Sequence, residues 1–195
     1  ASAAACPAAM AGGDTAALGV LDNVRRSNYD HCRDIALTAE RAGFTTILFP
    51  SAYIVGQDPV CFANAIAPQL SSLTPLIALR TGEDHPPMLA RKIAGLDHLL
   101  KGRLAINIIN SDLPGTREDP ILRYKRCEEV ITILKQAWTQ DRIEFRGDLY
   151  QFSLSADPAK PYQQNGGPLL YFGGISNGSR EVAAKHSDVF LLWPE

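Results

Sequence analysis

Segments typical of strands and segments typical of helices alternate along most of this chain, and that alternation constrains its fold more than any other feature. Runs of β-branched and aromatic residues predict strands at 44–50, 74–80, 104–110, 168–172 and 188–193. Helices are expected between them, at about 28–42, 60–70, 88–100, 122–139 and 179–186. Strands that are separated by helices form a parallel sheet with the helices outside it, in either a (β/α) barrel or a doubly wound fold. The 195 residues fall short of the roughly 250 that a closed eight-stranded barrel takes.

Two segments lie outside the alternation. Arg142–Phe152 consists of two alternating arms around Gly147 and Asp148, which predicts an inserted β-hairpin. Ala3–Ala11 is a candidate for an earlier strand, although it is rich in alanine, which is uncommon in strands. No Gly/Ser-rich or Pro-rich linker divides the chain, so residues 1–195 are expected to form a single domain.

Composition argues against several classes of function. The 19 Lys and Arg residues balance 21 Asp and Glu residues, and both signs are interspersed, which argues against a nucleic-acid binder with a broad basic face. No apolar run is long enough to predict a membrane span, and the Ala-rich start lacks the basic and bulky apolar regions of a signal peptide. The 4 cysteines are far apart, without the close spacing of a metal site, so no metal is expected. A cytoplasmic protein with reduced thiols is the favoured interpretation.

Ligands of parallel α/β folds bind at the carboxyl ends of strands, and the strand near residue 172 ends in the most informative sequence. Gly173 and Gly174 are followed by Ser176 and Ser179 at the start of a helix. Backbone N–H groups, hydroxyls and the positive end of a helix all suit a phosphate. The alternative is that the glycines only shape a tight turn and Ser179 only caps the helix.

Three other positions carry polar groups toward the same edge. Asn107 lies within an apolar strand, so it faces either a polar pocket or partners that satisfy its amide. Arg123 and Tyr124 lie at the start of a helix, where both could bind an anion. The alternative is that Arg123 is exposed to solvent and that Tyr124 packs against its neighbours. No Ser-His-Asp order, HExxH, GxSxG or GxGxxG motif is present, so the chemistry comes from a bound cofactor or is absent.

Taken together, seven ordered segments resemble the bacterial luciferase-like flavin monooxygenases, most closely the FMNH2-dependent alkanesulfonate monooxygenase branch. The segments that carry the resemblance are 13–19, 39–50, 76–80, 89–109, 123–138, 145–152 and 168–176. The resemblance implies a (β/α)8 TIM barrel, here incomplete, with about five to six of the eight strands. It also implies a monooxygenase that takes reduced FMN from an NAD(P)H-dependent FMN reductase and uses O2 to oxygenate a small substrate. An alkanesulfonate would then yield an aldehyde and sulfite, and a homo-oligomer is expected.

The resemblance also implies roles for individual residues. Asn107 would lie by the flavin, and Arg123 and Tyr124 would reach its phosphate end. Ser176, in the segment that begins with Gly173 and Gly174, would bind the phosphate. Thr116 takes the place at which some relatives have a flavin-contacting Glu, and is a further candidate.

Departures from the family leave the activity open. The alkanesulfonate enzymes have a cysteine where this chain has Gly56, and Cys61 comes five residues later. The family's catalytic His and Arg residues would lie beyond Glu195, so the catalytic residues are unassigned. The sequence is therefore either a fragment, truncated at its C-terminus, or a degenerate member. The alternative to a monooxygenase is a non-catalytic flavin-binding or assembly protein of the same barrel lineage.

Overall fold

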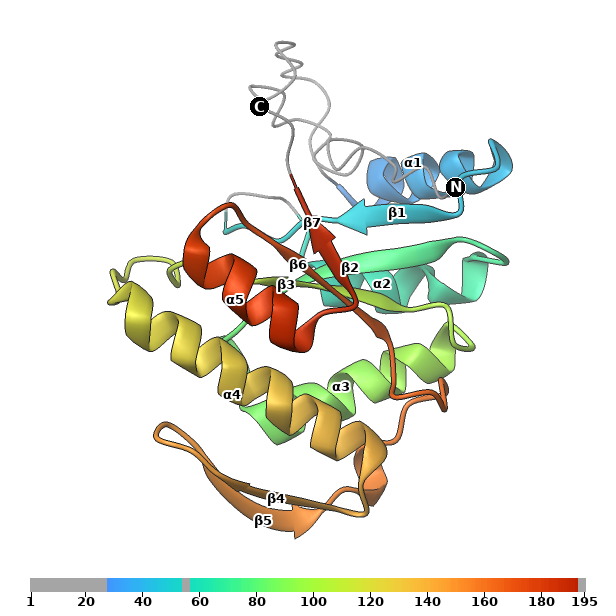
Figure 1. Cartoon of the computed structure of the whole chain (residues 1–195). Coiled ribbons are helices and arrows are strands. Elements are labelled where there is room, and N and C mark those ends of the chain that lie inside the picture. The colour runs from blue at the N-terminus through green and yellow to red at the C-terminus, as the bar shows by residue number, and fades with distance from the viewer. Residues whose placement is uncertain (1–27, 54–56, 193–195) are drawn as a thin grey trace. The chain divides into compact units, whose positions relative to one another are not determined.

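A computed structural model describes residues 28–53 and 57–192, and it confirms the alternation of strands and helices (Figure 1). The helices are α1 (Tyr29–Arg41), α2 (Pro59–Ile66), η3 (Ala67–Gln69), α3 (Pro86–Leu99), α4 (Pro120–Thr139), η4 (Asp157–Ala159) and α5 (Asn177–His186). The strands are β1 (Thr46–Phe49), β2 (Thr74–Arg80), β3 (Ala105–Ile109), β4 (Arg142–Arg146), β5 (Gln151–Ser155), β6 (Leu169–Gly173) and β7 (Val189–Leu191). The candidate strand at 3–11 and the family-like segment at 13–19 lie outside the described residues.

The order of the strands distinguishes between the two folds that the alternation allowed. Five strands form one sheet in the order β1-β2-β3-β6-β7, which is the order of the chain once the hairpin strands are set aside. β1 pairs with β2 in parallel, with Thr46 opposite Thr74, and β6 pairs with β7 in parallel, with Tyr171 opposite Val189. A doubly wound sheet reverses its strand order at one point, whereas a (β/α) barrel adds each strand beside the last. The fold is therefore that of a barrel portion with five strands.

Contacts between Cα atoms divide the chain into two compact units. The first comprises residues 1–78 and 103–105, and the second comprises 79–102 and 106–195. The expectation of a single domain stays a prediction.

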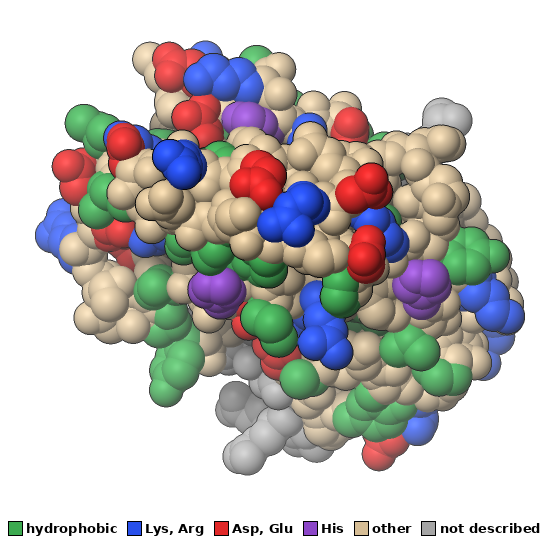
Figure 2. Space-filling view, turned by 90° about the horizontal axis from the view of Figure 1, so that it is seen from below, with side chains coloured by type: hydrophobic (Ala, Val, Ile, Leu, Met, Phe, Trp, Pro, Cys, Tyr) green, Lys and Arg blue, Asp and Glu red, His purple; other side chains and the backbone are tan. Residues whose placement is uncertain are grey.

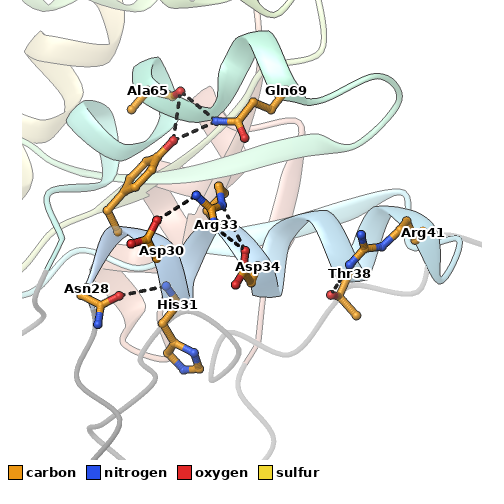
Figure 3. Close-up of polar contacts among 10 residues, drawn as sticks. Asn28, Asp30, His31, Arg33, Asp34, Thr38, Arg41, Ala65 and Gln69 are labelled. Atoms are coloured by element: carbon orange, nitrogen blue, oxygen red, sulfur yellow. Dashed lines mark hydrogen bonds and ion pairs between the residues drawn. The ribbon is translucent and has the colours of Figure 1, made fainter.

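The first unit contains α1, whose start is the one expected. Asn28 caps the helix by accepting a hydrogen bond from the amide of His31 at 2.9 Å. On the exposed side, Arg33 pairs with Asp30 and Asp34, as Figure 3 shows. On the buried side, Phe62 of α2 makes edge-to-face contacts with Phe49 and Tyr29, with ring centroids 5.0 Å and 5.9 Å apart. An apolar face thus fixes the helices against β1.

At the far end of α1, Glu40 holds the connection that leads into β2. Its Oε1 atom accepts from the amides of Ser71, Ser72 and Leu73 at 2.9, 2.6 and 2.7 Å. Burial raises the pKa of this carboxyl, but the three amides together hold the pKa below its ordinary value. One carboxylate therefore orders three consecutive backbone groups.

In the second unit α4 is the central helix, since it packs against α3, α5 and strand β4. Apart from Glu129, its buried side chains are apolar, and they include Ile131 and Leu134, which are at most 1% exposed. Trp138 extends this packing and donates from Nε1 to the carbonyl of Ala90 at 3.4 Å. The expected amphipathic helix is confirmed, and it begins two residues earlier than expected, at Pro120.

The inserted hairpin is confirmed as the antiparallel pair β4 and β5. Its second arm runs to Ser155, three residues beyond the expected end. Glu129 of α4, which is 8% exposed, accepts from the amides of Asp148, Leu149 and Tyr150 in the turn. A single buried carboxylate thus fixes the hairpin turn to α4.

Charged side chains of both signs are interspersed on the face that Figure 2 shows. That face carries no continuous basic area, in agreement with the balance of charges in the sequence. Among the described residues, no helix is long and apolar enough to cross a membrane, and no group of His, Cys, Asp and Glu could hold a metal ion.

Candidate functional site

The site lies in the second unit, where β6 ends and the chain turns into α5. Gly173 is the last residue of β6, and Ser176 is the N-cap of α5, where its Oγ accepts from the amide of Ser179 at 3.2 Å. A Cβ atom on Gly174 would lie 2.6 Å from Cβ of Ser179, so no other residue fits this turn without displacing the helix start. The cap is therefore Ser176 and not Ser179, and Gly174 allows the close approach of turn and helix.

Tyr124 of α4 lies over this helix start although it is far away in the sequence. Its hydroxyl is 2.7 Å from Oγ of Ser176. Its ring lies against the first turn of α5, because a Cβ atom on Gly178 would come within 2.7 Å of Tyr124 Cε2. The structure thus brings together two of the residues that the sequence predicted as phosphate ligands.

The arrangement presents several donors at one place. The first amides of a helix have no acceptor within the helix, and the helix dipole is positive at this end. Tyr124 and Ser176 have one hydroxyl hydrogen each, and their mutual bond uses one of the two. Ser176 Oγ also donates to Oγ of Ser179 at 3.3 Å, so an incoming acceptor would take the place of one of these hydroxyl contacts. The site can therefore bind an anionic oxygen group such as a phosphate.

Asn107 of β3 is 7% exposed, and its Oδ1 atom has no hydrogen-bond partner among the described residues. That atom lies 3.8 Å from the position a Cβ atom on Gly173 would take, which places it beside the end of β6. A buried carbonyl oxygen without a partner is costly. This observation favours the polar-pocket interpretation of Asn107 over that of an amide satisfied within the chain.

Arg123 is held by a different partner from the one predicted. Its Nη1 atom pairs with Asp112 in the loop after β3, and its side chain is 16% exposed. The amide of Glu118, followed by the Arg123 guanidinium, holds the pKa of Asp112 below its ordinary value. Within the described part of the chain, no recorded contact joins Arg123 to Ser176. A role of Arg123 at the phosphate stays a prediction.

Thr116 lies in the same loop and is exposed. Its hydroxyl and its amide both donate to the carbonyl of Leu113, at 2.9 and 3.0 Å. These bonds close a local turn, and among the described residues no contact links Thr116 to Asn107. Its flavin contact also stays a prediction.

An ion-pair network surrounds the loop after β3. Arg80, at the end of β2, donates to Glu83 at 2.6 Å and to Ser111 at 2.9 Å. Arg126 of α4 pairs with both carboxylate oxygens of Glu118. These pairs fix the loop between β3 and α4 at the edge where the strands end.

Sequence reasoning assigned no role to Asn110, the residue that directly follows β3. Both polar atoms of its side chain are buried, and neither has a hydrogen-bond partner within the described residues. The signal that could have found it is an amide immediately after an apolar strand, the same kind of signal that selected Asn107. Asn110 thus joins the set of polar side chains at this edge.

The fold and the site define a class of protein: a portion of a (β/α) barrel with an anion-binding helix start at the carboxyl edge of its sheet. A family profile described as "Luciferase-like monooxygenase" matches residues 6–195. The chain belongs to this family.

Relatives and solved structures agree with that assignment. The chain is 52% identical over 188 residues to the sulfoquinovose monooxygenase of Agrobacterium fabrum, covering 96% of this chain and 49% of the relative. It is 34% identical over 175 residues to the FMNH2-dependent dimethylsulfone monooxygenase of Pseudomonas fluorescens, covering 83% and 47%. The EDTA monooxygenase structure from Chelativorans sp. BNC1 has a TM-score of 0.76 at 18% identity, covering 84% and 46%. The chain therefore spans about half the length of the relatives it matches, and the incomplete barrel that the sequence predicted is confirmed.

Proposed function

We propose that this chain is part of an FMNH2-dependent monooxygenase that uses O2 to oxygenate a small organosulfur compound. The observation that carries the proposal is the start of α5, where the hydroxyls of Tyr124 and Ser176 lie at the positive end of the helix. Membership of the luciferase-like family and the name of an FMNH2-dependent relative support the choice of cofactor.

The residues present fit FMN. The Ser176 and Tyr124 hydroxyls, with the first amides of α5, would hold the phosphate, and Arg123 would add a positive charge nearby. Asn107 would offer its unpaired Oδ1 atom to the flavin ring system. Gly173 keeps a side chain away from the Asn107 Oδ1 atom, since a Cβ atom there would lie 3.8 Å from it. When bound, reduced FMN supplies the electrons with which O2 is activated.

The protein's own contribution at this site is to position the phosphate. Ser176 is fixed as the helix cap by the amide of Ser179, so its hydroxyl oxygen has a defined place. The Tyr124 ring is fixed by its contact with Gly178. Both hydroxyl oxygens are already in place, so binding would redirect only their hydrogens, which keeps the entropic cost of holding the cofactor low.

For the substrate, we propose a sulfonated sugar in preference to a simple alkanesulfonate. The support is the 52% identity to a relative named sulfoquinovose monooxygenase, a name that refers to a sugar bearing a sulfonate group. Oxygenation of the carbon next to the sulfonate would release sulfite and leave an aldehyde. An NAD(P)H-dependent FMN reductase would supply the reduced flavin. A homo-oligomer in the cytoplasm completes the proposal.

The test measures sulfite release from the sulfonates, and formaldehyde release from dimethylsulfone, by the purified protein in the presence of FMN, NADPH, a flavin reductase and O2. Sulfoquinovose, dimethylsulfone and ethanesulfonate are compared as substrates. Sulfite from sulfoquinovose, lost in the S176A variant at low FMN, supports the proposal, and faster release from ethanesulfonate would favour an alkanesulfonate enzyme. Tight FMN binding with no product from any of the three would contradict the proposed activity and favour the non-catalytic flavin-binding alternative.

A further inference from the structure

Asn110 has a side chain that the chain itself leaves unsatisfied. It is the first residue after β3, at the carboxyl edge where barrel ligands bind. Its Nδ2 and Oδ1 atoms are both buried, and neither has a hydrogen-bond partner in the described part of the chain. A primary amide carries two donor hydrogens and an acceptor oxygen, so burial without partners is costly on both sides.

The neighbours of Asn110 are already engaged, which fixes its backbone in place. The carbonyl of Ile109 accepts from the amide of Thr81 at 3.3 Å, so the end of β3 is tied to the residue after β2. On the other side, Ser111 accepts from Arg80 at 2.9 Å, and Asp112 pairs with Arg123. The amide is thus held between two fixed residues, and its lack of partners does not follow from a loose loop.

The two unsatisfied atoms define the chemistry of the missing partner. An anion such as phosphate or sulfonate offers only acceptors, and it would leave Oδ1 of Asn110 without a donor. A single partner that satisfies both atoms presents a hydrogen-bond donor beside an acceptor, as an uncharged polar edge does. Asn107, three residues earlier on β3, adds a second unpaired carbonyl oxygen and increases the need for donors at this edge.

We propose that Asn110 binds an uncharged donor–acceptor edge of the bound ligands, and so acts as a recognition residue distinct from the phosphate site. This inference rests on the proposed function. Two sources offer this chemistry: the imide of the flavin ring, with an N–H between two carbonyls, and the hydroxyl groups of a sugar sulfonate. Either source would satisfy both atoms of the carboxamide.

The experiment compares wild-type protein with N110L, which keeps the number and branching of the side-chain heavy atoms and removes the polar ones. N165L, at an exposed loop asparagine, is the matched control. The melting temperature of the ligand-free protein is measured first. We expect N110L to melt at or above the wild-type temperature, because it removes an unsatisfied amide. A clear fall in melting temperature that N165L does not share would mean that the amide has partners within the chain, and would overturn the proposal.

Ligand measurements then identify the source. If the flavin imide is the partner, N110L weakens FMN binding about tenfold and no longer distinguishes FMN from N3-methyl-FMN, which lacks the imide donor. If the sugar is the partner, N110L raises the KM for sulfoquinovose about tenfold and leaves the KM for ethanesulfonate unchanged. Unchanged values for all of these ligands in N110L would overturn this inference alone. A wild-type protein that binds neither FMN nor sulfoquinovose would overturn the proposed function, and this inference with it.

Discussion

Glu40 and Glu129 each accept hydrogen bonds from the backbone amides of a turn, but they use their carboxylate oxygens differently. This difference predicts that substitution by glutamine lowers stability at Glu129 much more than at Glu40. Glu129 uses both oxygens: Oε1 accepts from Asp148 at 2.8 Å, and Oε2 accepts from Tyr150 at 3.0 Å. Glu40 receives its three recorded amide bonds on Oε1 alone. Because glutamine offers one acceptor oxygen and one NH2 donor, it can replace Glu40 in this role but not Glu129.

The magnitudes follow from the number of bonds that each variant loses. In E129Q, one side of the carboxamide is an NH2 group that faces a backbone N–H. At least one backbone N–H therefore loses its acceptor, and the others bond to a neutral oxygen in place of a charged one. Hydrogen bonds to charged groups contribute about 1.5–3 kcal/mol each. The freed amides of the exposed turn can bind water, so we expect both E129Q and E129A to cost about 3 kcal/mol. At the more exposed Glu40, E40A should cost about 2 kcal/mol and E40Q less than about 1 kcal/mol.

The assay is urea unfolding of the four variants, followed by circular dichroism, with hydrogen exchange at residues 71–73 and 148–150 to locate the effect. The expected result is that E129Q resembles E129A, whereas E40Q resembles the wild type. Equal losses of stability for E40Q and E40A, or an E129Q variant as stable as the wild type, would show that the number of acceptor oxygens does not decide the effect of glutamine.

Three further predictions follow from single side chains. The pKa of Glu40 is held below its ordinary value near 4.5 in the folded protein, so this carboxylate stabilises the fold fully above pH 4.5 and loses that effect as the pH falls through the lower folded pKa. Urea unfolding at a series of pH values should show this loss of stability in the wild type and not in E40A. G178A should push the Tyr124 ring off the start of α5, which weakens FMN binding and lowers the free energy of unfolding by about 1–3 kcal/mol. The control G95A adds a methyl group at a helical position with open space around it, so it should raise the free energy of unfolding by about 0.5–1 kcal/mol in the same assay. Burial raises the pKa of the Cys127 thiol to about 12, so the thiol should not react with an alkylating reagent at pH 8 until the protein is unfolded. Mass spectrometry measures the alkylation, and rapid labelling of Cys127 in the folded protein would contradict this prediction.

Local signals predicted the elements well, and failed where a single residue changed the geometry. The cap at Asn28 and the strand Thr74–Arg80 were predicted to the residue, because each depends on its own sequence. The helix expected to reach Leu70 instead ends at Ile66 and continues as η3, because Pro68 has no amide hydrogen to continue the α-helical pattern. Periodicity alone does not register such an interruption.

The site was predictable only in part, because its contacts join distant segments. Ser176 was selected from its own sequence, as a hydroxyl at a strand-to-helix turn. That Tyr124 would lie on it, 52 residues away, came from the resemblance and not from any spacing. The pairing of Arg123 with Asp112 was not predicted, since an ion pair across a loop depends on how the loop folds. Asn110 was given no role although it follows an apolar strand, because the sequence does not show that both polar atoms of its side chain lack partners in the described part of the chain.

We propose above that the start of α5 binds the flavin phosphate. The most direct measurement is the ratio of the Kd for riboflavin, which lacks the phosphate, to the Kd for FMN, determined by fluorescence titration of the wild type and S176A. We expect the wild type to prefer FMN, and S176A to lose about tenfold of this preference while its riboflavin affinity stays unchanged. Equal affinities for riboflavin and FMN in the wild type, or the same preference in S176A, would contradict it.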